Sequence, residues 1–275
     1  MDINLFFCEG PHDISFLVRL LKDNNHIDYS DRPINSIPDK DLQRIIFNSL
    51  SQYKYNQDKN IFTQKPAIPS ILFKEDQYIL IYSTNGHLDK NVNHPEDDIF
   101  LRIVKDFQSI KKSDLFNDKI NNIRISLFYD ADDDIDKKIK NIDKYLSEIN
   151  IIKMTESISH NKIQELSDLR SIGCFIFKIP DDTKGCLEDI LIPILENNHG
   201  VKVLDSYSFL DTHFDNTISK RDFDRKKATI GIIGQLEKSG VANSSIISQT
   251  SLFKEKLTTP SCLEVYEFIK GNLAY

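Results

Sequence analysis

The 275-residue chain has no tryptophan, two methionines and four cysteines, and the cysteines form no Cys-x-x-Cys pair. This spacing argues against a zinc site and against a disulfide framework, so we expect buried free thiols. No apolar run approaches the roughly 20 residues that span a bilayer. The chain begins with the strand-like segment INLFFC, which leaves no room for a signal peptide. We therefore expect a cytoplasmic protein that makes no membrane contact.

Positive charge is outnumbered by negative charge, with 35 Lys and Arg residues against 42 Asp and Glu residues. The net charge is −7 and the isoelectric point is about 5.5, which argues against a protein that coats nucleic acid non-specifically. An enzyme with one local basic surface remains compatible with this balance. The 40% hydrophobic and 28% charged fractions are those of an ordinary globular protein.

Four short apolar segments alternate with amphipathic ones. The segments predicted as strands are 3–8, 78–83, 123–129 and 173–179. Helical stripes follow the first, third and fourth segments; Ile135, Ile139, Ile142, Leu146 and Ile149 form the clearest one. Strands that alternate with helices predict an α/β fold, a mostly parallel sheet flanked by helices in the Rossmann manner.

The alternation is interrupted twice. Residues 24–75 are rich in turn-forming residues and have one short helix candidate, so we interpret them as an insertion: a lid, a surface for a protein partner or only an elaboration of the fold. From about residue 200 the pattern is mainly helical. We therefore predict an α/β domain over 1–199, with a helical C-terminal extension over 200–275 packed on it.

Acidic residues follow two of the predicted strands. Glu9 comes directly after the first strand, and Asp130 and Asp132 follow the third. Ligands of parallel sheets bind beyond the carboxyl ends of the strands, so these three carboxylates are expected to converge there. Such a cluster repels itself unless a cation neutralises it, and carboxylates are typical ligands of Mg²⁺. Gly10 is expected to provide a sharp turn beside the ion.

Structural alternatives exist for these acids. Asp13 falls in the first turn of a predicted helix, where any acidic residue is favoured by the helix dipole. Asp132–Asp134 have the same alternative at the start of the next helix. An EF-hand loop that began at Asp130 is excluded, because it would need Gly and Glu where Ile135 and Asn141 occur.

Glu-Gly-x-x-Asp after a first strand and Asp-x-Asp after a third resemble the Toprim domain of topoisomerases, bacterial primases, recombination proteins and OLD-family nucleases. The resemblance covers roughly residues 1–24 and 76–180. Gly86 fits a turn that often follows the second strand of such domains. The matching residues are Glu9, Gly10, Asp13, Asp130 and Asp132.

A later segment, IPDDTKGCLED, resembles a small uncharacterised bacterial Toprim-related family that is similar to OLD nucleases. The residues that carry this second resemblance are Pro180, Gly185, Leu187, Glu188, Asp189, Lys227 and Ala228. In that family the glycine precedes a helix, which here would begin near Glu188. An ordinary acid in the first turn of a helix is the alternative for Glu188.

The resemblance implies phosphodiester or phosphoryl chemistry with Mg²⁺ or Mn²⁺. Glu9 would then act as general acid or base, and Lys227 would lie near the reacting group. The ion ligands implied are Glu9, Asp13, Asp130, Asp132 and Glu188, with Asp189 an alternative to Glu188 at a second ion. No tyrosine has a diagnostic setting for a topoisomerase, and a template-binding domain for a primase is not recognisable.

One dense basic run, KRDFDRKK, is a candidate for contact with nucleic-acid phosphates. Its cations are Lys220, Arg221, Arg225, Lys226 and Lys227. A solvated helix face is the alternative, and the same interpretation applies to Lys137, Lys138, Lys140 and Lys144. His12 and His160 have no partners at ligand spacing and are predicted to be surface histidines.

Three functions follow as hypotheses. The first is a metal-dependent nuclease that acts on DNA or RNA, for example as a defence or toxin-like effector. The second is a nucleic-acid- or nucleotide-binding module that does not catalyse alone. The third is a small-molecule phosphatase or phosphotransferase that uses the same acids.

Overall fold

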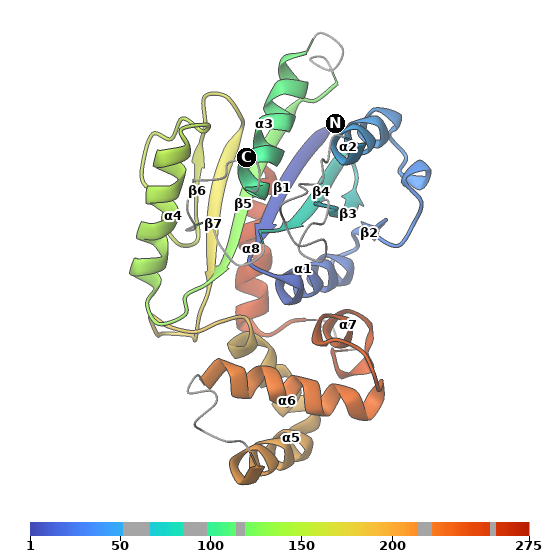
Figure 1. Cartoon of the computed structure of the whole chain (residues 1–275), viewed down its shortest axis with the longest axis vertical. Helices are drawn as coiled ribbons and strands as arrows, with labels where there is room; N and C mark the ends of the chain where they lie inside the picture. Colours follow the sequence, from blue (N-terminus) through green and yellow to red (C-terminus); the bar gives the residue numbers. More distant parts are fainter. Residues whose placement is uncertain are drawn as a thin grey trace, which may run out of the picture.

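The computed structural model describes residues 1–51, 67–84, 88, 98–113, 119–213, 222–253 and 257–274. Within these residues a seven-stranded sheet has the order β2-β3-β4-β1-β5-β7-β6 (Figure 1). The strands are β1 (Asp2–Cys8), β2 (Ile27–Asp28), β3 (Ser70–Lys74), β4 (Gln77–Ser83), β5 (Asn122–Asp130), β6 (Lys162–Glu165) and β7 (Ser171–Phe177). The central strands β4, β1, β5 and β7 are parallel, whereas β2, β3 and β6 pair antiparallel at the two edges. The predicted α/β class is confirmed, with a mixed sheet around a parallel centre.

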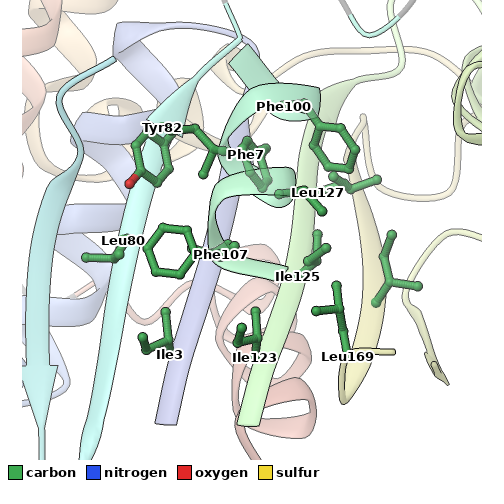
Figure 2. Packing of buried hydrophobic residues seen from close by; sticks show 14 of the residues in the cluster. Ile3, Phe7, Leu80, Tyr82, Phe100, Phe107, Ile123, Ile125, Leu127 and Leu169 are labelled. Carbon is green, nitrogen blue, oxygen red and sulfur yellow. The ribbon is translucent and has the colours of Figure 1, made fainter. Parts of the chain in front are cut away.

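The central strands are buried on both faces because helices cover both sides of the sheet. Ile3, Leu5 and Phe7 of β1 point to one core, and Phe6 and Cys8 point to the other, as the period of two in a strand requires. Figure 2 shows part of the first core, including the side chains of Phe7 and Phe100. The centroids of these two rings lie 4.7 Å apart.

Three helices cover the face on which Phe7 lies: α2 (Lys40–Ser51), α3 (Ile99–Lys112) and α4 (Ile135–Ile149). Two others, α1 (Pro11–Asp23) and α8 (Pro260–Ala274), pack on the opposite face. The remaining helical elements are η1 (Ile34–Ser36), α5 (Glu188–His213), α6 (Asp222–Glu237), α7 (Asn243–Gln249) and η4 (Ser251–Phe253). In Figure 1, α5, α6 and α7 lie together beyond the carboxyl ends of the central strands. This layer therefore covers the edge of the sheet where the motif acids are expected.

The four strands and the α4 stripe predicted from hydrophobic periodicity are all present. The segment predicted as an insertion is more than that, because its described parts supply β2, α2 and β3 to the sheet and its cover. The predicted boundary near residue 200 coincides with a kink in α5 at His199, whose φ/ψ of −142°/33° is not helical. The last helix, α8, returns to pack on the sheet.

All four cysteines are buried and free, as expected. Among the described helices, none combines the length and the apolar character that a bilayer crossing requires.

Candidate active site

The first motif follows β1. Gly10 is the N-cap of α1, and its N–H donates to Oδ2 of Asp13 at 2.7 Å. Gly10 itself is extended (φ −152°), and a Cβ added there would meet nothing within 4 Å. The chain does bend at Glu9 and Gly10, between β1 and α1, but Gly10 adopts no conformation there that requires glycine. Asp13 is buried and completes the cap of its own helix, as the structural alternative anticipated, but it also faces the other acids of the site.

The parallel register of β1 and β5 brings Glu9 to Asp130, because Cys8 is paired with Phe128. The backbone N–H of Asp130 donates to Oε2 of Glu9 at 3.4 Å. The side chain of Asp130 is buried, and its Oδ1 accepts from the N–H of Leu187 at 2.8 Å. The ends of both strands thus share one polar site with the start of α5.

Asp132 and Gly185 fix the segment before α5. Each N–H of this pair donates to the carbonyl oxygen of the other at 2.9 Å. Gly185 has a φ of +130°, and an added Cβ would lie 2.5 Å from the backbone nitrogen of Ile179. Glycine is required here for its conformation and for space. Asp132 also has a positive φ, 53°, and its side chain turns outward, 47% exposed.

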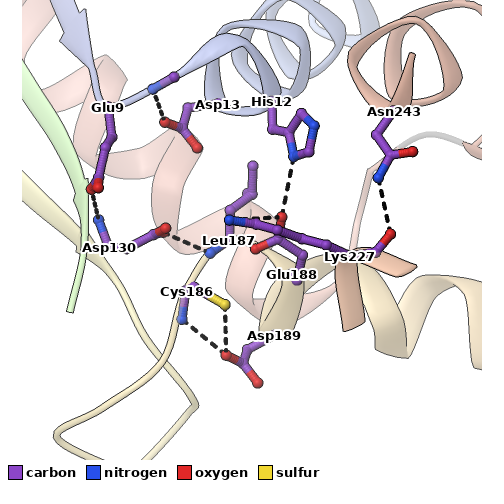
Figure 3. A network of polar contacts seen from close by, with 11 residues as sticks. Glu9, His12, Asp13, Asp130, Cys186, Leu187, Glu188, Asp189, Lys227 and Asn243 are labelled. Carbon is purple, nitrogen blue, oxygen red and sulfur yellow. Dashed lines mark hydrogen bonds and ion pairs between the residues drawn. The ribbon is translucent and has the colours of Figure 1, made fainter. Parts of the chain in front are cut away.

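Figure 3 shows Glu188 within the polar network of the site. Its exposed fraction of 1% is smaller than those of Asp13 and Asp130. Its Oε1 lies 3.2 Å from Nδ1 of His12 and 3.9 Å from Nζ of Lys227, whereas its Oε2 is buried with no hydrogen-bond partner. The carbonyl oxygen of Lys227 accepts a 2.9 Å hydrogen bond from Nδ2 of Asn243, which ties α6 to α7. His12, predicted to be a surface histidine, is therefore part of the site, and nothing in the sequence pairs it with a residue 176 positions away.

The carboxylates perturb one another. Burial raises the pKa of Asp13 to about 7, with Glu9 and Glu188 adding to the rise. Burial, followed by the charges of Asp13, Glu9 and Glu188, also raises the pKa of Asp130 well above its usual value. Burial alone would do the same to Glu188, but His12 and Lys227 outweigh it and hold its pKa below the usual value. Strongly shifted carboxylates with named charged neighbours are typical of functional sites.

Lys138 lies at the outer side of this cluster. Its Nζ is 2.8 Å from Oδ2 of Asp132 and 3.6 Å from Oε2 of Glu9, and its side chain is only 19% exposed. The prediction of a solvated lysine was wrong at this position. The phase of α4 was the available signal, because residue 138 comes three after Ile135 and four before Ile142 on the apolar stripe.

The donor chemistry suits a divalent ion, since the site offers several carboxylates and an unpartnered buried oxygen on Glu188. However, no group of three His, Cys, Asp or Glu side chains in the described part of the chain has a metal-holding arrangement. Glu9, Asp130 and Asp132 thus share the predicted edge but do not form one closed ligand set. Their assignment as metal ligands stays a prediction, as does that of Asp13 and Glu188.

Within the described residues, cations of the basic run form ion pairs with carboxylates of this chain. The guanidinium of Arg225 lies 2.6 Å from a carboxylate oxygen of Asp211 and over the Tyr207 ring. Nζ of Lys226 lies 2.6 Å from Oδ1 of Asp189.

Phosphate binding by the basic run stays a prediction; Lys220, Arg221 and also Gly86 lie outside the described residues. The other predicted surface histidine, His160, is half-buried, and its Nδ1 accepts from the N–H of Ile176 at 3.0 Å.

No protein-family model matches this chain, and no curated protein does. Among solved structures, it is similar to a hypothetical protein of Pyrococcus horikoshii OT3, with 14% sequence identity and a TM-score of 0.48. The match covers 99% of this chain and 95% of the other.

Proposed function

We propose that this protein is a cytoplasmic, Mg²⁺- or Mn²⁺-dependent nuclease that hydrolyses phosphodiester bonds in DNA or RNA, with a Toprim-like site. The observation that supports the proposal is the convergence of Glu9, Asp13, Asp130 and Glu188 with Lys227 beyond the carboxyl ends of parallel strands. A structural cluster of acids gains nothing from burial without compensation, because desolvated like charges destabilise the fold.

We assign a role to each of these side chains from how exposed it is. Asp13, Asp130 and Glu188 are buried and would hold the ion, with Asp132 and Glu9 at the rim. A divalent ion bound there would neutralise charge on a phosphate oxygen and orient the attacking water. Glu9 is more accessible, with a 24% exposed side chain, and suits a general acid or base. Lys227 is 37% exposed beside Glu188 and provides a cation for the phosphate.

A second candidate is a small-molecule phosphatase or phosphotransferase. The ion pairs of Arg225 and Lys226 favour it, because cations already paired with carboxylates contribute less to a polynucleotide surface. The negative net charge of the chain points the same way.

The decisive experiment incubates the protein with plasmid, single-stranded DNA, RNA and p-nitrophenyl phosphate, each with Mg²⁺, Mn²⁺ or excess EDTA. We expect metal-dependent cleavage of a polynucleotide that is lost in Asp130→Asn and kept in Glu148→Gln, an exposed acid at the far end of α4. Hydrolysis of the phosphomonoester alone would favour the second candidate. Equal activity of the Asp130→Asn variant would contradict both.

A further inference from the structure

The ammonium group of Lys138 occupies a position between two motif carboxylates. It lies 2.8 Å from Oδ2 of Asp132 and 3.6 Å from Oε2 of Glu9. A lysine side chain is cationic at neutral pH, and here both of these carboxylates lie within ion-pair distance of it. This one ammonium therefore offsets one of the two negative charges of the outer pair.

The backbone around this cation is held firmly. Oδ1 of Asp134 caps α4 by accepting from the N–H groups of Asp136 and Lys137 at 2.8 and 3.1 Å. The N–H of Ile135 donates to the carbonyl oxygen of Thr183 at 2.7 Å. The Asp132–Gly185 bridge fixes the other side. Only the flexible stem of Lys138 can carry its charge away from the two carboxylates.

We propose that Lys138 is the resident counter-ion of Glu9 and Asp132 and competes with a divalent cation for these two carboxylates. The inference rests on the metal-dependent function proposed above. A divalent ion bound by either acid would lie close to the ammonium, and the repulsion between the two cations would weaken or break the lysine's ion pairs. The free energy of the two ion pairs is then subtracted from the affinity for the metal.

The test is titration of the full chain with Mn²⁺, followed by calorimetry and by the electron paramagnetic resonance of free Mn²⁺. We expect Lys138→Met to lower the Mn²⁺ dissociation constant roughly fivefold to tenfold, the factor that partly screened ion pairs correspond to. Lys137→Met, an exposed lysine on the same turn, should leave the constant unchanged. Without metal, Lys138→Met should also melt at a lower temperature, and Mn²⁺ should recover the difference.

An unchanged or larger dissociation constant in Lys138→Met would overturn the inference. If Lys138→Met folds poorly, Lys138→Gln keeps more of the polar stem and carries the same expectation. Loss of Mn²⁺ binding in Asp130→Asn, together with no effect of Lys138→Met, would leave the metal site standing and remove only the counter-ion role. No Mn²⁺ binding in wild type or in either Lys138 variant would remove the metal-dependent function as well.

Discussion

The sheet carries two buried polar networks, one at each end of the same strands. Near the amino ends of β1 and β5, Arg124 pairs with Asp2 at 2.7 Å, so opposite charges cancel. Close by, Asn272 of α8 accepts from Ser171 and donates to Ser126 and the Ile125 carbonyl, all at 2.6–2.9 Å. The carboxyl end instead crowds Glu9, Asp13, Asp130 and Glu188 around two lysines and a histidine.

The two networks differ in how their charges affect the stability of the fold. At the amino end the charges balance and the Asn272 hydrogen bonds are made, although Nε of Arg124 is buried without a hydrogen-bond partner. A network of balanced charges and mostly satisfied hydrogen bonds stabilises a fold. A buried network of like charges with raised pKa values costs stability and is retained where a ligand uses it. We therefore propose that the amino end serves stability and that the carboxyl end serves the proposed activity.

The largest predicted change in the free energy of unfolding comes from the pH dependence of the carboxyl-end network. The pKa of Asp13 is about 7 in the folded protein against an ordinary 3.8. Between these values the folded state holds a proton that the unfolded state has lost, so the free energy of unfolding falls as pH rises from 4 to 7. The loss amounts to about 4 kcal/mol at most. The measurement is denaturant unfolding without metal at pH 5 and pH 7.5.

Asp13→Asn should remove this contribution, while Glu148→Gln should keep it. The Asn side chain can still accept from the Gly10 N–H, so the cap of α1 survives. Identical pH profiles for wild type and Asp13→Asn would mean that the carboxyl end is as well compensated as the amino end, and the comparison would fail.

At the amino end, Asn272→Ala removes three buried hydrogen bonds and leaves two hydroxyls and a carbonyl without their partner. We expect a loss of about 3 kcal/mol in the free energy of unfolding, measured with urea. Asn48→Ala, at an exposed position of α2, should cost less than about 0.5 kcal/mol. The increase in melting temperature that metal produces should be the same in all three proteins. A changed metal response in Asn272→Ala would show that the two networks are coupled.

Metal addition should stabilise the protein only through the carboxyl end. At about 100-fold excess over the dissociation constant, Mg²⁺ or Mn²⁺ that binds the folded state alone adds about 2.7 kcal/mol. Asp130→Asn removes one like charge at nearly constant shape, so without metal it should be as stable as wild type or slightly more so. It should lose most of the metal-dependent stabilisation, measured by thermal melting. Equal responses in both proteins would return the acids to a structural role at helix ends.

Much of this arrangement was predicted from the sequence, and these predictions succeeded for a physical reason. Apolar runs and the α4 stripe are strong periodic signals, and parallel strands necessarily place the residues after them at one edge. Glu9 and Asp130 were found in this way. Short edge strands such as β2 and β6 have only 2 and 4 residues, too few to establish a period.

The rest depends on tertiary contacts. His12 and Glu188 meet only because the loop after β1 and the start of α5 lie at the same edge of the sheet. Lys138 lies on the apolar stripe of α4, whereas the neighbouring lysines do not. The lysine-rich composition of this segment does not show the difference. The positive φ of Gly185 is imposed by its bridge to Asp132, a contact between segments that no local pattern connects.

The smallest expected effect concerns Arg225, which belongs to neither of the two polar networks. Arg225 is paired with Asp211 and lies over the Tyr207 ring, so by the same argument we expect it to have a structural role. Arg225→Ala should cost less than about 1 kcal/mol, because a pair this exposed is screened by solvent. The binding of this variant to single-stranded DNA should have the salt dependence of wild type. The control is Lys270→Ala, which removes an exposed cation paired with Glu267 on α8 and should also leave the salt dependence unchanged. A slope of log binding constant against log salt that falls by about one in Arg225→Ala alone would show that this guanidinium leaves Asp211 for a phosphate. Charge compensation in the free protein would then no longer exclude a binding role, and the basic run would join the proposed nuclease site.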